Sequence, residues 1–252
     1  MTKKSIVAGN WKMNKTPLET ATFIHDIGKL VSNNGVVDII ISPPYTSLNN
    51  LESRLSISIA AQNCHWEDSG AFTGEISLEM LKGCGVEYVI TGHSERRQIF
   101  DESDKIVNKK FSAISESGLK PILCIGETIK DRKNGKTGSV LRKQLENALR
   151  GIQNLENCFV AYEPVWAIGT GMTADMNQIE EAHSIITEVI SEKIKITNHL
   201  YILYGGSVNS DNASDIIAIK NVDGFLIGGA SLDADSFASI IDIVEKNREK
   251  IQ

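Results

Sequence analysis

The chain has 252 residues, of which 41% are hydrophobic and 23% charged, so it has the composition of a globular protein long enough to bury a large core. Its formal net charge of −6 gives no general attraction for nucleic acid or for acidic membranes. Aromatic residues make up 6% and are not interleaved with basic residues, so stacking against nucleic-acid bases is not expected either.

Short apolar runs alternate with longer amphipathic segments along the whole chain. Most of the runs are almost continuously apolar, as in parallel strands that are buried on both faces. They predict eight strands, at Ile6–Trp11, Val37–Ser42, Ile57–Gln62, Tyr88–Thr91, Pro121–Ile125, Phe159–Tyr162, Tyr201–Tyr204 and Gly224–Ile227.

The segments between the runs have the spacing of amphipathic helices. Apolar residues recur every three or four positions within Val107–Ile114, Leu141–Ile152, Ile179–Ile190 and Phe237–Val244. Eight strand–helix units predict an α/β protein, a (β/α)8 barrel with outer helices, formed by residues 1–252 as one domain. An open doubly wound sheet is the alternative, and it is weaker because no G-x-G-x-x-G follows the first strand.

A barrel of this type places functional residues at the carboxyl ends of its strands. Glu163 follows the sixth run and is restricted to extended geometry by Pro164. Gly169 and Gly171 allow the following loop to swing and its amides to approach a ligand. We interpret Glu163 as a catalytic base, rather than part of an ordinary loop, and the next residues as a lid: Pro164, Val165, Trp166, Ala167, Ile168, Gly169, Thr170 and Gly171.

Two more polar side chains follow predicted strands. His93 precedes Ser94, the expected N-cap of a helix, whose positive end disfavours an imidazolium and leaves a neutral hydrogen-bond donor. Strand alternation points Asn10 and Lys12 in the same direction, and an inward lysine requires an anion. The alternatives are a structural histidine and a solvated lysine.

Two glycine pairs follow the last two predicted strands. Gly205–Gly206–Ser207 precedes a helix with Asn209 or Ser210 as its expected N-cap, and Gly228–Gly229 follows the eighth strand. Glycine lets backbone N–H groups face an anion, and barrel phosphate sites are commonly built from these two loops. The pairs therefore predict a phosphate site.

The cysteines and the N-terminal residues indicate a cytoplasmic protein. Cys64, Cys84, Cys124 and Cys158 are widely spaced, so neither a metal site nor a disulfide framework is expected. Residues 1–4 lead into a strand rather than a signal peptide, and no run approaches the roughly 20 apolar residues of a membrane helix.

The motifs resemble those of the triosephosphate isomerase family. The matching stretches follow the family order over nearly the whole chain: A-G-N-W-K-M-N (8–14), A-Q-N (61–63), G-A-F-T-G-E-I-S (70–77), G-H-S-E-R-R (92–97), C-I-G-E-T (124–128), A-Y-E-P-V-W-A-I-G-T-G (161–171), Y-G-G-S-V (204–208) and V-D-G-F-L-I-G-G-A-S-L (222–232).

The resemblance implies interconversion of dihydroxyacetone phosphate and glyceraldehyde 3-phosphate through an enediolate, without a cofactor, in glycolysis and gluconeogenesis. Glu163 would transfer the proton and His93 would donate to the enediolate oxygens. Lys12 and Asn10 would stabilise negative charge, and Glu95 would orient Lys12. This family is itself a standard case of a glutamate base beside a neutral histidine, so these roles come from the resemblance.

The resemblance also implies a phosphate site and a homodimer. The phosphate would be held by backbone N–H groups at Gly169, Ser207, Gly228 and Gly229. Lid closure would exclude water from the reaction. Thr73, in the loop of residues 70–77, would enter the neighbouring subunit of the homodimer.

Three positions depart from the family pattern, although none is expected to be directly catalytic. Met172 replaces a lysine after the lid, and Thr187 and Tyr201 replace arginines that would support the region near the seventh strand. Two other functions remain as alternatives. The first is a barrel enzyme for a larger sugar or indole phosphate, disfavoured by the short lid. The second is a catalytically silent binding protein, disfavoured by the intact polar set.

Overall fold

Within the described residues, eight parallel strands pair in chain order and close into a barrel, with β1 against β8. The computed structural model describes all residues except 1–2, 32–34, 50, 52–56, 169–171 and 250–252. The strands are β1 (Ser5–Asn10), β2 (Val37–Ser42), β3 (Ile57–Ala61), β4 (Tyr88–Thr91), β5 (Lys120–Ile125), β6 (Asn154–Tyr162), β7 (Lys195–Tyr204) and β8 (Gly224–Ile227). The predicted barrel is confirmed, and the open sheet is excluded.

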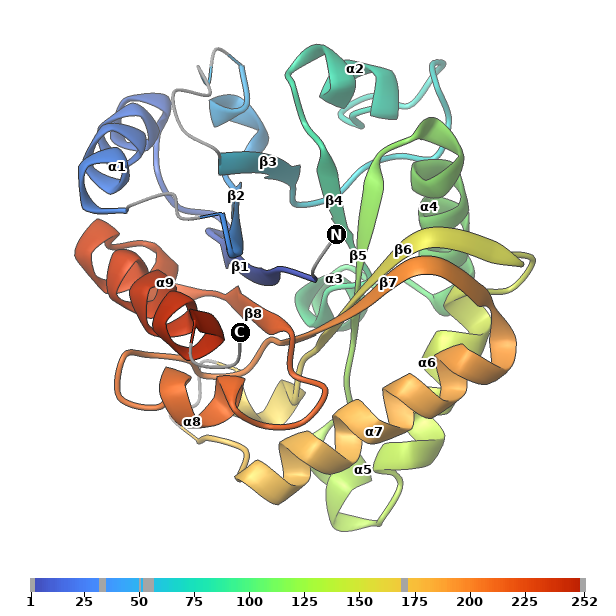
Figure 1. Cartoon of the computed structure of the whole chain (residues 1–252). Helices are drawn as coiled ribbons and strands as arrows, with labels where there is room; N and C mark the ends of the chain where they lie inside the picture. The colour runs from blue at the N-terminus through green and yellow to red at the C-terminus, as the bar shows by residue number, and fades with distance from the viewer. Residues whose placement is uncertain (1–2, 32–34, 50, 52–56, 169–171, 250–252) are drawn as a thin grey trace.

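Helices surround the strands (Figure 1). They are α1 (Pro17–Leu30), α2 (Leu78–Gly83), α3 (Ser94–Ile99), α4 (Asp104–Ser117), α5 (Ile129–Lys133), α6 (Thr137–Ala148), α7 (Met176–Lys193), α8 (Ala213–Ile217) and α9 (Ala234–Glu249). Short 3₁₀ turns occur at η1 (Tyr45–Ser47), η2 (Val165–Ala167) and η3 (Gly229–Ser231). In the part of the chain that the structure describes, no helix has the length and apolarity that a membrane crossing needs.

Apolar side chains are buried on both faces of the barrel wall. Ile6 and Ala8 belong to the cluster inside the barrel, whereas Val7 belongs to the cluster between strands and helices. Burying a side chain of this size contributes about 1.5–3 kcal/mol. Because neighbouring residues of one strand enter opposite clusters, the strands appear in the sequence as unbroken apolar runs.

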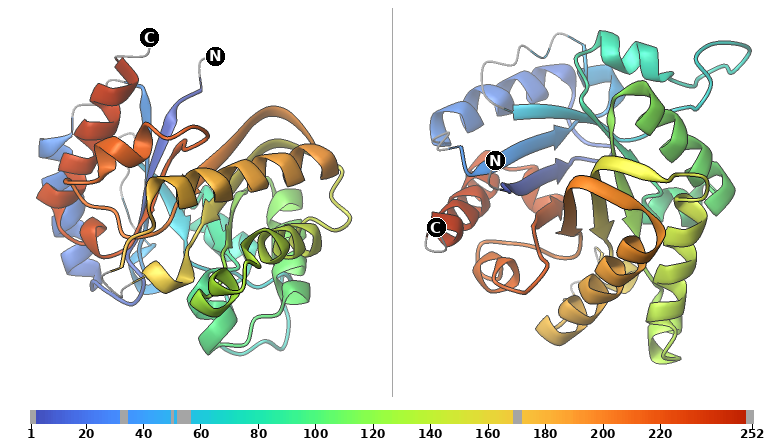
Figure 2. Two further views of the ribbon diagram at one scale, coloured as in Figure 1. Left: turned by 90° about the horizontal axis from the view of Figure 1, so that it is seen from below. Right: turned by 45° about the vertical axis from the view of Figure 1, so that its right-hand side comes forward.

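The strands β6 and β7 are longer than predicted. Residues 154–158 of β6 pair with residues 195–200 of β7, but neither segment pairs with the strand on its other side. This part forms a two-stranded ribbon that extends outward from the barrel (Figures 1 and 2). Its residues are exposed or partly exposed apart from Cys158, so no apolar run marks most of it in the sequence.

The tyrosine that replaces an arginine of the family pattern is held by other contacts. Tyr201 stacks on Phe159 with ring centroids 4.8 Å apart and planes 2° apart. Lys3 lies over the Tyr201 ring at 5.1 Å and pairs with Asp223 at 2.7 Å. Aromatic stacking and an N-terminal lysine therefore connect this part of β7 to β6 and to the start of β8.

His183, on α7, is a fully buried histidine outside the barrel mouth. Its Nδ1 lies 2.8 Å from the carbonyl of Asn221, and its ring meets the Tyr162 ring edge-on at 6.0 Å. Thr187, the other departure from the family pattern, donates its hydroxyl to the His183 carbonyl at 2.9 Å. Burial lowers the pKa of His183 to about 4.

This lowered pKa predicts an acid-sensitive fold. Between pH 6.5 and 4 the unfolded chain binds a proton at His183 that the folded chain does not, so the free energy of unfolding should fall with pH across this window. The full effect is about 3 kcal/mol, and it is absent above pH 6.5. Urea unfolding at several pH values would measure it. His183→Asn should have a shallower slope than the wild type, whereas His199→Asn, at a partly exposed position, should keep the wild-type slope. Equal slopes for wild type and His183→Asn would contradict the assignment.

Candidate active site

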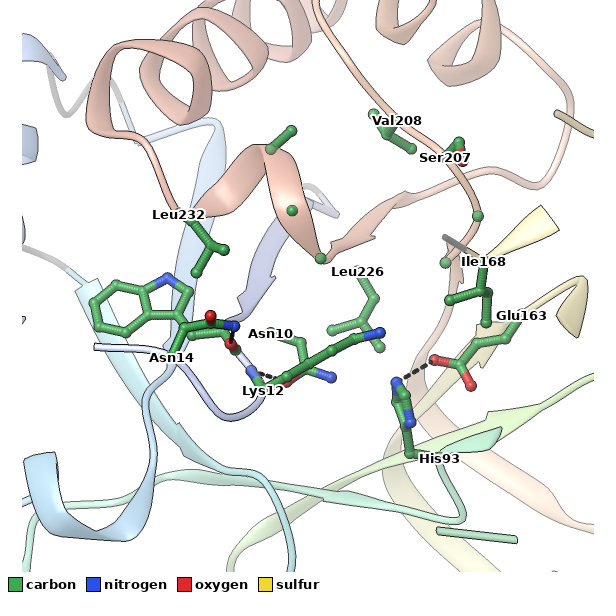
Figure 3. Close-up of a pocket in the computed structure, with 16 residues that line it drawn as sticks. Asn10, Lys12, Asn14, His93, Glu163, Ile168, Ser207, Val208, Leu226 and Leu232 are labelled. Atoms are coloured by element: carbon green, nitrogen blue, oxygen red, sulfur yellow. Dashed lines mark hydrogen bonds and ion pairs between the residues drawn. The ribbon is translucent and has the colours of Figure 1, made fainter. Parts of the chain in front are cut away.

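A pocket of 370 Å³ lies at the carboxyl ends of the strands. Figure 3 shows Lys12 extending across it, with His93 and Glu163 facing each other at one side. Loops after five strands contribute to its wall, and the residues predicted from the sequence that line it are Asn10, Lys12, His93, Glu163, Ser207, Gly228 and Gly229. The structure therefore brings together side chains that are more than 150 positions apart in the chain.

Glu163 is held from both its backbone and its side chain. It follows β6 and is 2% exposed, and its backbone N–H donates to the Ile125 carbonyl at 2.8 Å. Its Oε2 accepts a hydrogen bond from the Ser94 backbone at 3.0 Å, and its Oε1 lies 3.1 Å from Nε2 of His93. The carboxylate is thus buried but has hydrogen-bond partners on both oxygens, as a buried charge requires.

The predicted cap of α3 is wrong by one residue. His93, not Ser94, is the N-cap, because its Nδ1 accepts a hydrogen bond from the backbone N–H of Glu95 at 3.2 Å. A nitrogen that accepts this bond has no proton, so Nε2 must be the protonated nitrogen of a neutral ring. The helix start therefore directs the His93 N–H toward Glu163.

Lys12 lines the pocket, but not through strand alternation. The strand β1 ends at Asn10, and Lys12 has φ 54°, a left-handed conformation that is uncommon for a residue with a side chain. Asn10 Oδ1 accepts from the Lys12 backbone N–H at 3.1 Å, and Gln62 donates to the Lys12 carbonyl at 2.8 Å. The Lys12 ammonium lies 2.5 Å from the Glu95 carboxylate. Neighbouring side chains thus fix a turn that redirects the lysine.

The loops after β7 and β8 present backbone groups to the pocket. Ser207, Gly228 and Gly229 line it, and Gly228 precedes the turn η3. Asn209 accepts hydrogen bonds from the backbones of Asp211 and Asn212, at 2.9 and 3.2 Å. It therefore caps the turn before α8, whereas the helix itself begins at Ala213 with no side-chain cap.

The predicted lid begins with the turn η2. Ser207 donates its hydroxyl to the Ala167 carbonyl at 2.9 Å, which connects the lid to the loop after β7. Gly169, Thr170 and Gly171 lie outside the described residues. Met172, after them, has 47% of its surface exposed.

The carboxylate that anchors the start of the lid was not singled out from the sequence. Glu127 is fully buried and accepts hydrogen bonds from Trp166 Nε1 at 3.0 Å and from the Tyr162 hydroxyl at 3.2 Å. Arg132 pairs with it at 3.1 Å. Only its position just after the fifth strand, within C-I-G-E-T, could have indicated a role. The lid tryptophan is thus tied to a charge on the neighbouring loop.

Two remaining predictions concern residues near the pocket. Cys124 is fully buried, and burial, followed by the nearby charge of Glu163, raises the pKa of its thiol well above the usual value. Thr73 is exposed in a loop outside the pocket, beside Phe72, whose ring packs on His65 at 4.4 Å. Among the described side chains, no group of three His, Cys, Asp or Glu residues is placed to hold a metal ion.

Comparison with known proteins gives consistent matches. A sequence model of the family described as triosephosphate isomerase matches residues 5–244. The triosephosphate isomerase of Alkaliphilus metalliredigens is 45% identical over 95% of this chain and 99% of its own length. The enzymes of the same name from Fusobacterium nucleatum and Thermodesulfovibrio yellowstonii are 46% and 47% identical, over 95% and 96% of this chain and 98% and 99% of their own lengths.

Replacing Glu127 by glutamine should destabilise the fold. The amide keeps an acceptor for Tyr162 and Trp166 but leaves the partly buried Arg132 without its charge partner, so unfolding should cost about 1–3 kcal/mol less. Urea unfolding would measure the loss. Glu181→Gln is the matched control, because Glu181 is the exposed partner of Arg132 at 3.4 Å, and its loss should change stability by about 0.5 kcal/mol or less. A Glu127→Gln protein as stable as the wild type would refute the role of this charge.

Proposed function

The chain belongs to the triosephosphate isomerase family and interconverts dihydroxyacetone phosphate and glyceraldehyde 3-phosphate, a step of glycolysis and gluconeogenesis, and we propose that the pocket at the barrel mouth performs this reaction. The observation that carries the proposal is the approach of His93 Nε2 to the Glu163 carboxylate at 3.1 Å, beside Lys12. A base, a neutral donor and a cation in one pocket are the groups that enolisation of a phosphorylated carbonyl compound needs. No cofactor takes part in the proposed reaction.

Glu163 acts as the base. It removes a proton from the carbon beside the carbonyl, the C–H electrons form a carbon–carbon double bond, and the carbonyl electrons move to oxygen. The resulting enediolate takes the proton back from Glu163 on the neighbouring carbon, which gives the isomer. His93 Nε2 supports this role, because the N–H that now meets Glu163 can turn to the substrate oxygens when substrate separates the two side chains.

Lys12 and Asn10 offset the negative charge of the substrate. The ammonium of Lys12 is held by Glu95 at 2.5 Å, and Asn10 fixes the turn that carries the lysine. A cation fixed before substrate arrives needs little reorganisation when charge develops on the enediolate. Glu95 is therefore a positioning residue that acts through Lys12.

The phosphate group of the substrate lies against the loops after β7 and β8. Backbone N–H groups at Ser207, Gly228 and Gly229 bind it, as their position in the pocket wall supports. Gly169 completes this site when the lid closes over it. Closure also excludes water, which protects the enediolate from losing its phosphate.

We further infer a cytoplasmic homodimer in which each chain forms one domain. The loops after β1 and β3 carry exposed apolar side chains, with Met13 94% and Phe72 42% exposed, as a surface that pairs with another chain would. Thr73, beside Phe72, enters the partner subunit and braces its site.

The proposed roles predict a specific loss of activity. An assay that couples formation of either triose phosphate to a dehydrogenase should show turnover, and solvent deuterium should enter the product. Glu163→Asp should lower kcat by about 100-fold while leaving the fold intact, because it withdraws the carboxylate by about 1 Å. An inactive wild-type protein would reject the pocket as an isomerase site, and full activity in Glu163→Asp would reject the base.

The proposed dimer predicts the mass in solution. Sedimentation equilibrium should give twice the mass of one chain, and Thr73→Arg should shift it toward the single chain because a bulky cation cannot enter the partner. Thr197→Arg makes the same substitution on the exposed ribbon of β7 and should keep the dimer mass. A wild-type protein with the mass of one chain would rule out the dimer.

A further inference from the structure

A glutamine outside the pocket makes two hydrogen bonds to the backbone of one glycine. Gln144, on α6, accepts from the Gly126 backbone N–H at 2.9 Å through Oε1 and donates to the Gly126 carbonyl at 3.0 Å through Nε2. Gly126 is the first residue after β5 and precedes Glu127. The side chain of Gln144 therefore satisfies both backbone groups of Gly126 at once.

Gly126 in turn lies directly against the backbone of Glu163. A Cβ built on Gly126 would fall 1.7 Å from the Glu163 carbonyl oxygen, so no other residue fits there. The hydrogen bonds on either side run from Glu163 N–H to the Ile125 carbonyl, at 2.8 Å, and from Val165 N–H to the Glu127 carbonyl, at 3.2 Å. The position of residues 125–127 thus determines the position of residues 163–165.

The space beside this contact is not filled by side chains. A cavity of 180 Å³ is lined by Gly126, Gln144, Glu163 and Val165, together with Arg97. A backbone segment beside a cavity can shift into it when its hydrogen bonds are lost, since little close packing opposes the movement there. The two bonds from Gln144 are the direct link between α6 and Gly126.

We propose that Gln144 is a positioning residue for the catalytic base, which it holds in place through the backbone of Gly126. The proposal rests on the assignment of Glu163 as the base. An amide is required, because only a side chain with a donor and an acceptor can satisfy both Gly126 groups. Displacing a reacting group by about 1 Å can lower the rate by about 100-fold, so a partial shift should lower kcat by about 10-fold or more.

Three variants test this role. Gln144→Leu removes both hydrogen bonds at nearly constant side-chain size, and Gln144→Glu keeps an acceptor for the Gly126 N–H but loses the donor while its carboxylate is ionised. Asn108→Leu is the matched control. Asn108, on α4, also makes two amide hydrogen bonds, at 2.9 Å each, to the carbonyls of Ala148 and Arg150 at the end of α6.

Kinetics and stability together separate positioning from a general loss of structure. Gln144→Leu and Asn108→Leu should both lower the melting temperature, but only Gln144→Leu should lower kcat by about 10-fold or more, with KM within about twofold of the wild type. With substrate deuterated at the carbon that loses the proton, the isotope effect on kcat should be larger in Gln144→Leu, because proton removal then limits turnover. Gln144→Glu should lie between Gln144→Leu and the wild type.

The outcomes distinguish this proposal from the assignment of the base. If Gln144→Leu has the kcat and isotope effect of Asn108→Leu, the positioning role is wrong, although wild-type turnover and the effect of Glu163→Asp would stand. If Gln144→Leu does not fold, Gln144→Glu decides, and a kcat and isotope effect equal to those of the wild type overturn the proposal. If Glu163→Asp is fully active, the assignment of the base fails first.

Discussion

The pocket depends on the closure of β1 against β8. Residues Ile6–Gly9 pair with Gly224–Ile227, and the backbones approach so closely that a Cβ on Gly224 would fall 1.8 Å from the Ile6 carbonyl oxygen. Parallel pairing around a closed ring brings every strand to the same mouth with its carboxyl end. Glu163 and Lys12 meet there because the ring closes, and a side chain at Gly224 would force β1 and β8 apart.

The sequence predicts the barrel well because each strand of the ring is buried on both faces. It does not predict the start of β6, since residues 154–157 gain backbone hydrogen bonds from β7 without burying a continuous apolar surface. The lysine at position 12 is placed in the pocket for a reason other than the expected one. Alternation suggested its direction, whereas a left-handed turn beyond the strand provides it.

The polar residues behind the pocket could not be predicted from local pattern. Glu127 and Gln144 have ordinary surroundings in the sequence, and what they do depends on partners that only the fold supplies. By contrast, His93 and Glu163 could be selected because proline, glycine and helix-start signals adjoin them. Sequence patterns thus identify groups that face a substrate more readily than groups that hold those residues in place.

The N-cap of α3 has a consequence for when the protein can become active. The same imidazole that faces Glu163 is the acceptor for the first turn of the helix, so the tautomer of His93 depends on that turn being formed. A nascent or partly unwound chain has no such bond and holds no single tautomer. Competence for proton transfer therefore appears together with local order in α3, and a chain still emerging from synthesis has no means of releasing a reactive enediolate.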